Sequence, residues 1–176
     1  MKFLPIFILT ATVLLAQKES ALTTESYKLV NDLNTAENRS AIYMCREVNN
    51  MWTDYFMPKS IKDEFPQKKA DTIAKYIGGN IAIWKKNIPI VESWEPRVKA
   101  TEYVNYHGLN IDEFSRTHNR NGVFLYSTPL FNAERTKALI YIWYLSSKNV
   151  VLDNYYYCEK ENGKWKKKNV VLIGGF

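Results

Sequence analysis

Residues 149–173 read NVVLDNYYYCEKENGKWKKKNVVLI, and this stretch decides the fold. Two segments rich in Val, Tyr and other strand-forming residues flank Asn162-Gly163. This pair is preferred in a two-residue type I′ hairpin because both central positions need φ > 0. The turn then sets two acidic–basic pairs opposite each other on one face: Glu161 with Lys164, and Glu159 with Lys166. The other face should point into the core and carries Tyr156, Cys158 and Trp165.

Further strands are predicted upstream, at residues 122–131 and 137–145 and, less regularly, at 97–107. The strand at 137–145 has apolar side chains on both faces. One face carries Ala138, Ile140, Ile142 and Tyr144, and the other carries Leu139, Tyr141, Trp143 and Leu145. Such a strand is central in its sheet, or its outer face meets a helix, a partner subunit or a ligand.

Helices are expected in the N-terminal half of the chain. The strongest pattern covers residues 41–56, where apolar side chains recur at i, i+3, i+4 and i+7. A helical segment is also expected around Leu22–Leu33, a shorter helix at 67–77, and a helical turn within 108–121. The predicted fold class is α+β, with N-terminal helices packed on a curved antiparallel sheet that ends in a β-meander.

The N-terminus has the pattern of a secretory signal. In residues 1–16 a single positive charge, Lys2, precedes an almost wholly apolar run that ends at Ala16. The run is shorter than the ~20 residues that span a bilayer. We expect cleavage after Ala16, with an uncleaved N-terminal anchor as the alternative. Residues 17–176 should form a single domain without a transmembrane segment, in the periplasm, the outer envelope or the extracellular space.

The chain is basic, with a net charge of +6 that falls to +5 when Lys2 is removed with the signal. Export argues against nucleic acid as a partner, so the relevant polyanions are anionic lipids, acidic glycans or an acidic protein face. Alternatively, the positive charge is spread over the surface and only keeps the protein soluble. The lysines around Trp165 form a basic aromatic patch, or they discourage edge-to-edge strand pairing. They are Lys164, Lys166, Lys167 and Lys168.

Cys45 and Cys158 are the two cysteines. Cys45 lies on the apolar side of the predicted 41–56 helix, and Cys158 on the inward face of a strand. If that helix packs across the sheet, an oxidising compartment permits a disulfide between them. Two separate buried thiols fit the sequence equally well. Neither cysteine lies in a C-x-x-C or nucleophile motif, so thiolate catalysis is not predicted.

His107 and His118 are the two histidines, and their spacing does not match a zinc motif. Either of them could form a general acid–base pair with a nearby carboxylate such as Asp112. The alternative is that both are surface or loop histidines with ordinary hydrogen bonds. The sequence contains no glycine-rich phosphate loop and no metal-ligand cluster, so neither a cofactor nor a metal is predicted.

Four motifs follow one another in the C-terminal third: Ser127-Thr-Pro-Leu-Phe-Asn132, Glu134-Arg-Thr-Lys-Ala-Leu-Ile-Tyr141, Tyr155-Tyr-Tyr157 and Glu161-Asn-Gly-Lys-Trp-Lys166. In this order they resemble a group of uncharacterised exported bacterial proteins. Those proteins often carry a Cys- and Gly-rich loop where this chain reads Leu145-Ser-Ser-Lys-Asn149. The resemblance implies an exported protein with this strand order. The succession of helices and curved sheet is also similar to the nuclear-transport-factor-like cone fold, which hosts both enzymes and binding modules.

These observations favour a non-catalytic exported module that binds a protein partner or another envelope component. The absence of a linear catalytic motif and the apolar outer face of residues 137–145 support this hypothesis. The first alternative is a small pocket hydrolase or isomerase that uses a His–carboxylate pair. The second alternative is a protein that attaches to a polyanionic surface.

Overall fold

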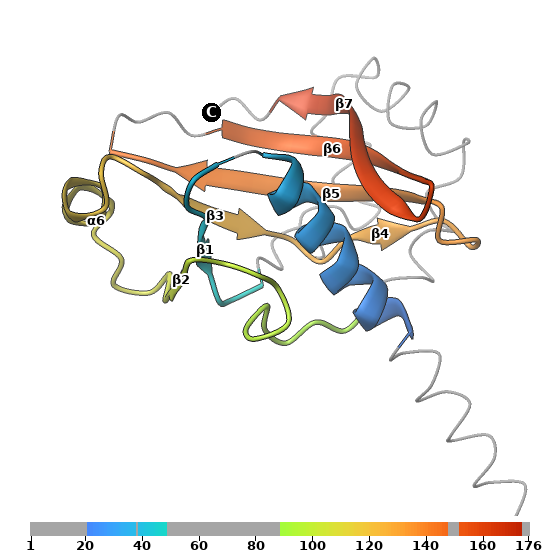
Figure 1. The fold of residues 1–176 in the computed structure, drawn as a ribbon, viewed down its shortest axis with the longest axis horizontal. Helices are drawn as coiled ribbons and strands as arrows, with labels where there is room; N and C mark the ends of the chain where they lie inside the picture. Colours follow the sequence, from blue (N-terminus) through green and yellow to red (C-terminus); the bar gives the residue numbers. More distant parts are fainter. Residues whose placement is uncertain (1–20, 38, 49–88, 148–151, 174–176) are drawn as a thin grey trace, which may run out of the picture.

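The computed structural model describes residues 21–37, 39–48, 89–147 and 152–173 (Figure 1). Within them, residues 21–36 are helical, and a short helix, α6, spans Ile111–Thr117. Seven strands form one sheet: β1 (Tyr43–Cys45), β2 (Glu102–Val104), β3 (Val123–Tyr126), β4 (Leu130–Phe131), β5 (Lys137–Leu145), β6 (Leu152–Glu161) and β7 (Lys164–Ile173). The predicted α+β class is confirmed. The predicted signal sequence and the predicted helix at 67–77 lie outside the described residues.

The strand order is β2-β1-β3-β5-β6-β7, with β4 beside β5. β1 pairs in parallel with β2 and β3, and the remaining pairs are antiparallel. The predicted hairpin is confirmed: Glu161 lies opposite Lys164, and the turn residues Asn162 and Gly163 have φ angles of 50° and 77°. β5, β6 and β7 follow the predicted strands, and β5 lies between β3 and β6, but the strand predicted at 122–131 is divided into β3 and β4.

The helix predicted at 41–56 is wrong in its described part, because residues 43–45 form strand β1. Residues 49–56 lie outside the described residues. Met44 and Cys45 are both fully buried, on opposite faces of the sheet. A strand that is buried on both faces has a continuous apolar sequence. A buried helix can have the same pattern, so the periodicity of apolar residues does not distinguish the two. The strand predicted at 97–107 is also shorter than expected, since only β2 forms.

The N-terminal helix crosses one face of the sheet, which we call the helix face (Figure 1). Leu29, Val30 and Leu33 are buried there, in one cluster with Cys158 and Trp165. This placement confirms the predicted inward direction of Cys158 and Trp165. The Leu22–Leu33 helix is confirmed as well, because its buried residues follow the helical period.

The opposite face, which we call the outer face, has a smaller core of Cys45, Phe114, Val123 and Leu125. Trp143 and Leu145 of β5 pack against this core and are only partly buried. Cys45 and Cys158 thus lie on opposite faces, and both are free thiols. The premise of the predicted disulfide, a shared core, does not hold, because Cys45 sits on a strand within the sheet rather than on a helix that covers it.

Glu161, beside the hairpin turn, should titrate at unusually low pH. Hydrogen bonds from Lys166, at 2.8 Å, and from Lys168 lower the pKa of its carboxyl from 4.5 to about 2. Because the folded-state pKa lies below the unfolded value, these contacts stabilise the fold above pH 4.5, and their contribution is lost as the pH falls toward 2. We expect NMR titration of the Glu161 carboxyl to give a midpoint near 2 and a Lys166→Met/Lys168→Met variant to titrate higher. Equal midpoints in the two proteins would contradict this assignment.

Candidate functional site

The short helix α6 lies beside the end of the sheet near β2. Both ends of this helix are capped by hydrogen bonds. The Asn110 side chain accepts a hydrogen bond of 3.2 Å from the Glu113 backbone N–H, which satisfies the first turn. At the other end, the backbone N–H of His118 donates to the Phe114 carbonyl at 3.0 Å. Phe114 packs edge-on against Tyr43 of β1, with ring centroids 5.3 Å apart. The short helix is thereby held on the outer face.

His118 links α6 to β2. Its Nδ1 lies 2.9 Å from the Phe114 carbonyl oxygen, and its Nε2 lies 3.2 Å from Oε2 of Glu102. The imidazole also stacks on the Phe114 ring, at 3.9 Å and 10°. A general base needs one ring nitrogen directed at a substrate. In His118 both nitrogens already face protein acceptors, so the residue connects α6 with β2 rather than offering a nitrogen to a substrate.

The structure does not bring the other two predicted site residues to His118. His107 is exposed in the turn after β2, and Asp112 is exposed in the first turn of α6. Within the described residues, no hydrogen bond joins Asp112 to either histidine. The carboxylate that meets His118 is Glu102, 16 residues away in sequence. Sequence spacing alone did not indicate this pair, since β2 and α6 are brought together by the pairing of β2 with β1.

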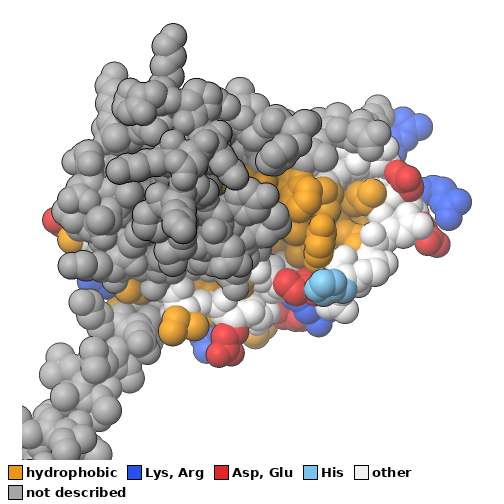
Figure 2. Space-filling view, turned by 180° about the vertical axis from the view of Figure 1, so that it is seen from behind, with side chains coloured by type: hydrophobic (Ala, Val, Ile, Leu, Met, Phe, Trp, Pro, Cys, Tyr) orange, Lys and Arg blue, Asp and Glu red, His pale blue; other side chains and the backbone are white. Residues whose placement is uncertain are grey.

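An aromatic surface lies beside this connection, and we define it as Tyr106, His107 and Trp143. The Tyr106 ring contacts the His107 ring, with centroids 6.0 Å apart, and the Trp143 ring at 6.2 Å. Tyr106 is 40% exposed, and Trp143 is half-buried. In Figure 2, which views the molecule from behind, hydrophobic side chains reach the surface beside a histidine and acidic side chains. Tyr106, in the turn after β2, and Trp143, on β5, therefore form a ring contact that is partly open to solvent.

The indole N–H of Trp143 is buried and has no hydrogen-bond partner within the described part of the chain. A buried donor without an acceptor costs about 1–3 kcal/mol, so native structures rarely retain one without a reason. The sequence placed Trp143 on the second apolar face of the strand at 137–145, but it did not predict the contact with Tyr106.

No protein-family model, curated protein or solved structure matches this chain. The resemblance to exported bacterial proteins and to the cone fold therefore stays a prediction, and the function is argued from the residues. None of the helices in the described segments has the length and apolar character needed to cross a membrane.

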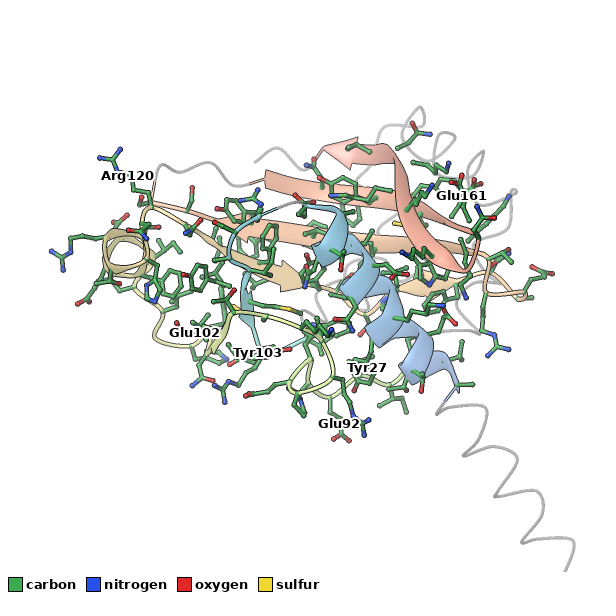
Figure 3. All side chains as sticks on the ribbon, in the orientation of Figure 1. Tyr27, Glu92, Glu102, Tyr103, Arg120 and Glu161 are labelled. Carbon is green, nitrogen blue, oxygen red and sulfur yellow. The ribbon has the colours of Figure 1, made fainter. Side chains whose placement is uncertain are left out.

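The lysines around Trp165 are largely paired with carboxylates. Lys160 lies 2.6 Å from Glu25, and the other ion pairs are Lys166 with Glu161, Lys167 with Glu37 and Lys168 with Glu161. Figure 3 places Glu161 at the far end of the sheet from Glu102, so this group is separate from His118. Internal pairing reduces the field that would attract a polyanion. The lysines act mainly as partners for acidic side chains of the same chain.

Both cysteines are unsuited to nucleophilic chemistry. Burial, and secondarily the charge of Glu47, raises the pKa of the Cys45 thiol to about 12. Burial also raises the pKa of the Cys158 thiol to about 12, although Lys167 acts in the opposite direction. The thiolate is the reactive form of cysteine, and it is scarcely populated at neutral pH with such pKa values.

Proposed function

We propose that this protein is a non-catalytic, exported module of the cell envelope that binds a protein partner through the aromatic surface. The observation that carries the proposal is the contact between Tyr106 and Trp143 on the outer face, where two partly exposed rings meet and the Trp143 indole N–H is buried with no acceptor among the described residues. Tyr and Trp dominate the binding energy of protein interfaces, because they bury large areas and retain a polar group. A partner that offers an apolar contact would suit this surface, because the Tyr106 and Trp143 rings are partly exposed.

The alternative of a pocket hydrolase or isomerase has less support. Both ring nitrogens of His118 face acceptors of this chain, at 2.9 and 3.2 Å. His107 is exposed and makes its ring contact with Tyr106. Neither histidine is positioned with a ring nitrogen free beside a second carboxylate among the described residues. The polyanion alternative has less support too, because most of the lysines near the hairpin are paired internally.

The test is retention of a partner from a solubilised envelope fraction on the immobilised protein. We expect Tyr106→Ala to reduce retention of the bound polypeptide by at least about fivefold, as for the loss of a contact worth ~1 kcal/mol or more. Ile90→Ala is the matched control, because Ile90 is an apolar side chain that is 65% exposed outside the aromatic surface. Circular dichroism would verify that both variants are folded. Equal retention by the two variants, or no polypeptide retained by the wild-type protein, would overturn the proposal.

A further inference from the structure

A second cluster of charges lies on the helix face, where the N-terminal helix ends above the sheet. There the Glu37 carboxylate is shared by two cations, since Oε1 contacts Lys167 Nζ and Oε2 lies 3.7 Å from Arg39 Nε. The side chains of Arg39 and Lys167 are 33% and 28% exposed. The cluster therefore has one more positive than negative charge, and it is sheltered but reachable from solvent.

Aromatic rings hold both cations in place independently of Glu37. The Arg39 guanidinium lies 4.7 Å from the Tyr144 ring centroid and 5.0 Å from that of Phe124. It also donates a hydrogen bond of 3.2 Å to the Tyr144 hydroxyl. Such cation–π contacts contribute about 0.5–2 kcal/mol each, depending on how far water is excluded. Arg39 would thus keep its position on β3 and β5 if the carboxylate moved away.

Lys167 is supported in the same way from β6. Its ammonium lies 4.9 Å from the ring centroid of Tyr156, whose hydroxyl accepts a hydrogen bond of 3.2 Å from the Asn154 side chain. The cluster is consequently assembled from five parts of the chain: the end of the N-terminal helix, β3, β5, β6 and β7. No short sequence motif could have indicated it.

Arg39 forms an ion pair with Glu37 but no hydrogen bond with it. At 3.7 Å the Nε–Oε2 distance is too long for a hydrogen bond, so this contact is an ion pair only. Within the described residues, the guanidinium makes one hydrogen bond, to Tyr144. Its remaining donors form the planar fork that binds a carboxylate through two parallel bonds. Glu37 is the residue that follows the helical segment 21–36, so its side chain can turn away without unwinding buried helix.

We propose that Arg39 and Lys167 form a binding site for the carboxylate of a ligand, and that Glu37 occupies this site in the free protein as an internal substitute. The incoming carboxylate forms two hydrogen bonds with the Arg39 guanidinium and an ion pair with Lys167, while Glu37 turns to solvent. A free small carboxylate and an acidic side chain of a peptide share this chemistry. The site lies on the helix face and does not depend on the aromatic surface.

The experiment removes the internal competitor with Glu37→Gln and titrates the protein with sodium acetate at constant chloride. The reporter is the amide NMR signal of Gly122, because its N–H donates to the Tyr144 hydroxyl that Arg39 also contacts. We expect a saturable shift in the variant, and an affinity at least about tenfold lower in the wild-type protein, where the tethered Glu37 competes at high effective concentration. Glu37→Ala removes the same carboxylate and should give the same result. In Glu37→Gln/Arg39→Gln the saturable shift should disappear.

Glu161→Gln is the matched control, and its acetate titration is followed by the amide signal of Gly163, in the turn beside Glu161. Glu161 also lies between two lysines, Lys166 and Lys168, but the described residues place no aromatic ring against either of them. Acetate binding of equal strength in Glu37→Gln and Glu161→Gln would overturn the proposal, since charge alone would then suffice. The absence of a saturable shift in either Glu37 variant would also overturn the proposal. So would phosphate binding that is as tight as acetate binding.

Titration with the blocked peptide Gly-Glu-Gly distinguishes the two sources of the carboxylate. Tighter binding than that of acetate assigns the site to a peptide side chain, and weaker binding assigns it to a small carboxylate.

Discussion

Replacing Trp165 by alanine is expected to lower the free energy of unfolding by about 3–5 kcal/mol, the range for truncation of a buried aromatic residue. Trp165 is 1% exposed, and its ring packs against Phe131 with centroids 5.6 Å apart. Its indole N–H donates to the Glu25 carboxylate at 2.6 Å, and its backbone N–H donates to Asp32 at 2.8 Å. The residue therefore joins the last hairpin to the N-terminal helix. Denaturant unfolding followed by circular dichroism measures the loss.

Two further variants separate burial from hydrogen bonding at this position. Trp165→Phe keeps much of the apolar area and leaves Glu25 paired with Lys160, so its loss should be smaller than that of the alanine variant. Val170→Ala on the same strand changes a side chain that is 46% exposed, and its effect should stay within about 0.5 kcal/mol. If Trp165→Ala were no more destabilising than Val170→Ala, the packing of the helix on the hairpin would be disproved.

Asn34→Ala should be the second strongly destabilising change, although it removes only a small side chain. The Asn34 side chain is buried, accepts a hydrogen bond of 2.5 Å from the Tyr126 hydroxyl and donates one of 3.3 Å to the Lys99 carbonyl. Each buried group that loses its partner costs about 1–3 kcal/mol. The variant leaves the buried Tyr126 hydroxyl without its acceptor, whereas the carbonyl of the exposed residue Lys99 can accept from water instead. Thermal and denaturant unfolding both report the change.

A double-mutant cycle tests this assignment. Tyr126→Phe removes the hydroxyl that Asn34→Ala leaves without an acceptor, so the double variant should be more stable than the sum of the single losses predicts, by about 0.5–3 kcal/mol. Thr35→Ala is the control on the same helix, because the Thr35 hydroxyl makes an exposed hydrogen bond of 2.8 Å to the Asn31 carbonyl. Strict additivity of Asn34→Ala and Tyr126→Phe, or an equal loss in Thr35→Ala, would contradict the buried pair.

The C-terminal meander could be predicted because its determinants are local. Asn162-Gly163 favours one turn type, and alternation sets the register from that turn as far as the pair Cys158–Lys167, beyond which two irregularities shift the pairing of β6 with β7. The segment 41–56 could not be predicted in the same way. β1 is three residues long and forms because β2 and β3 pair with it on both sides, and neither partner is adjacent to it in sequence.

The candidate sites depended even more on distant contacts. The histidines were visible in the sequence, but the carboxylate that meets His118 belongs to β2 rather than to α6. The aromatic surface joins Tyr106 to Trp143, and the proposed carboxylate site joins Arg39 to Lys167 across most of the chain. These residues share no sequence motif, and taken singly each of them looks like an ordinary surface residue in the sequence.

By itself the sequence determined the α+β class, the helix around Leu22–Leu33 and the final hairpin with its inward Trp165. These features depend on backbone preferences and side-chain periodicity within a few residues, so short stretches of chain suffice to specify them. Only the tertiary structure decided which face each cysteine occupies, which carboxylate neutralises each cation and which aromatic rings stay accessible. Those outcomes depend on pairing between strands far apart in sequence, because charge and burial energies act through space and not along the chain.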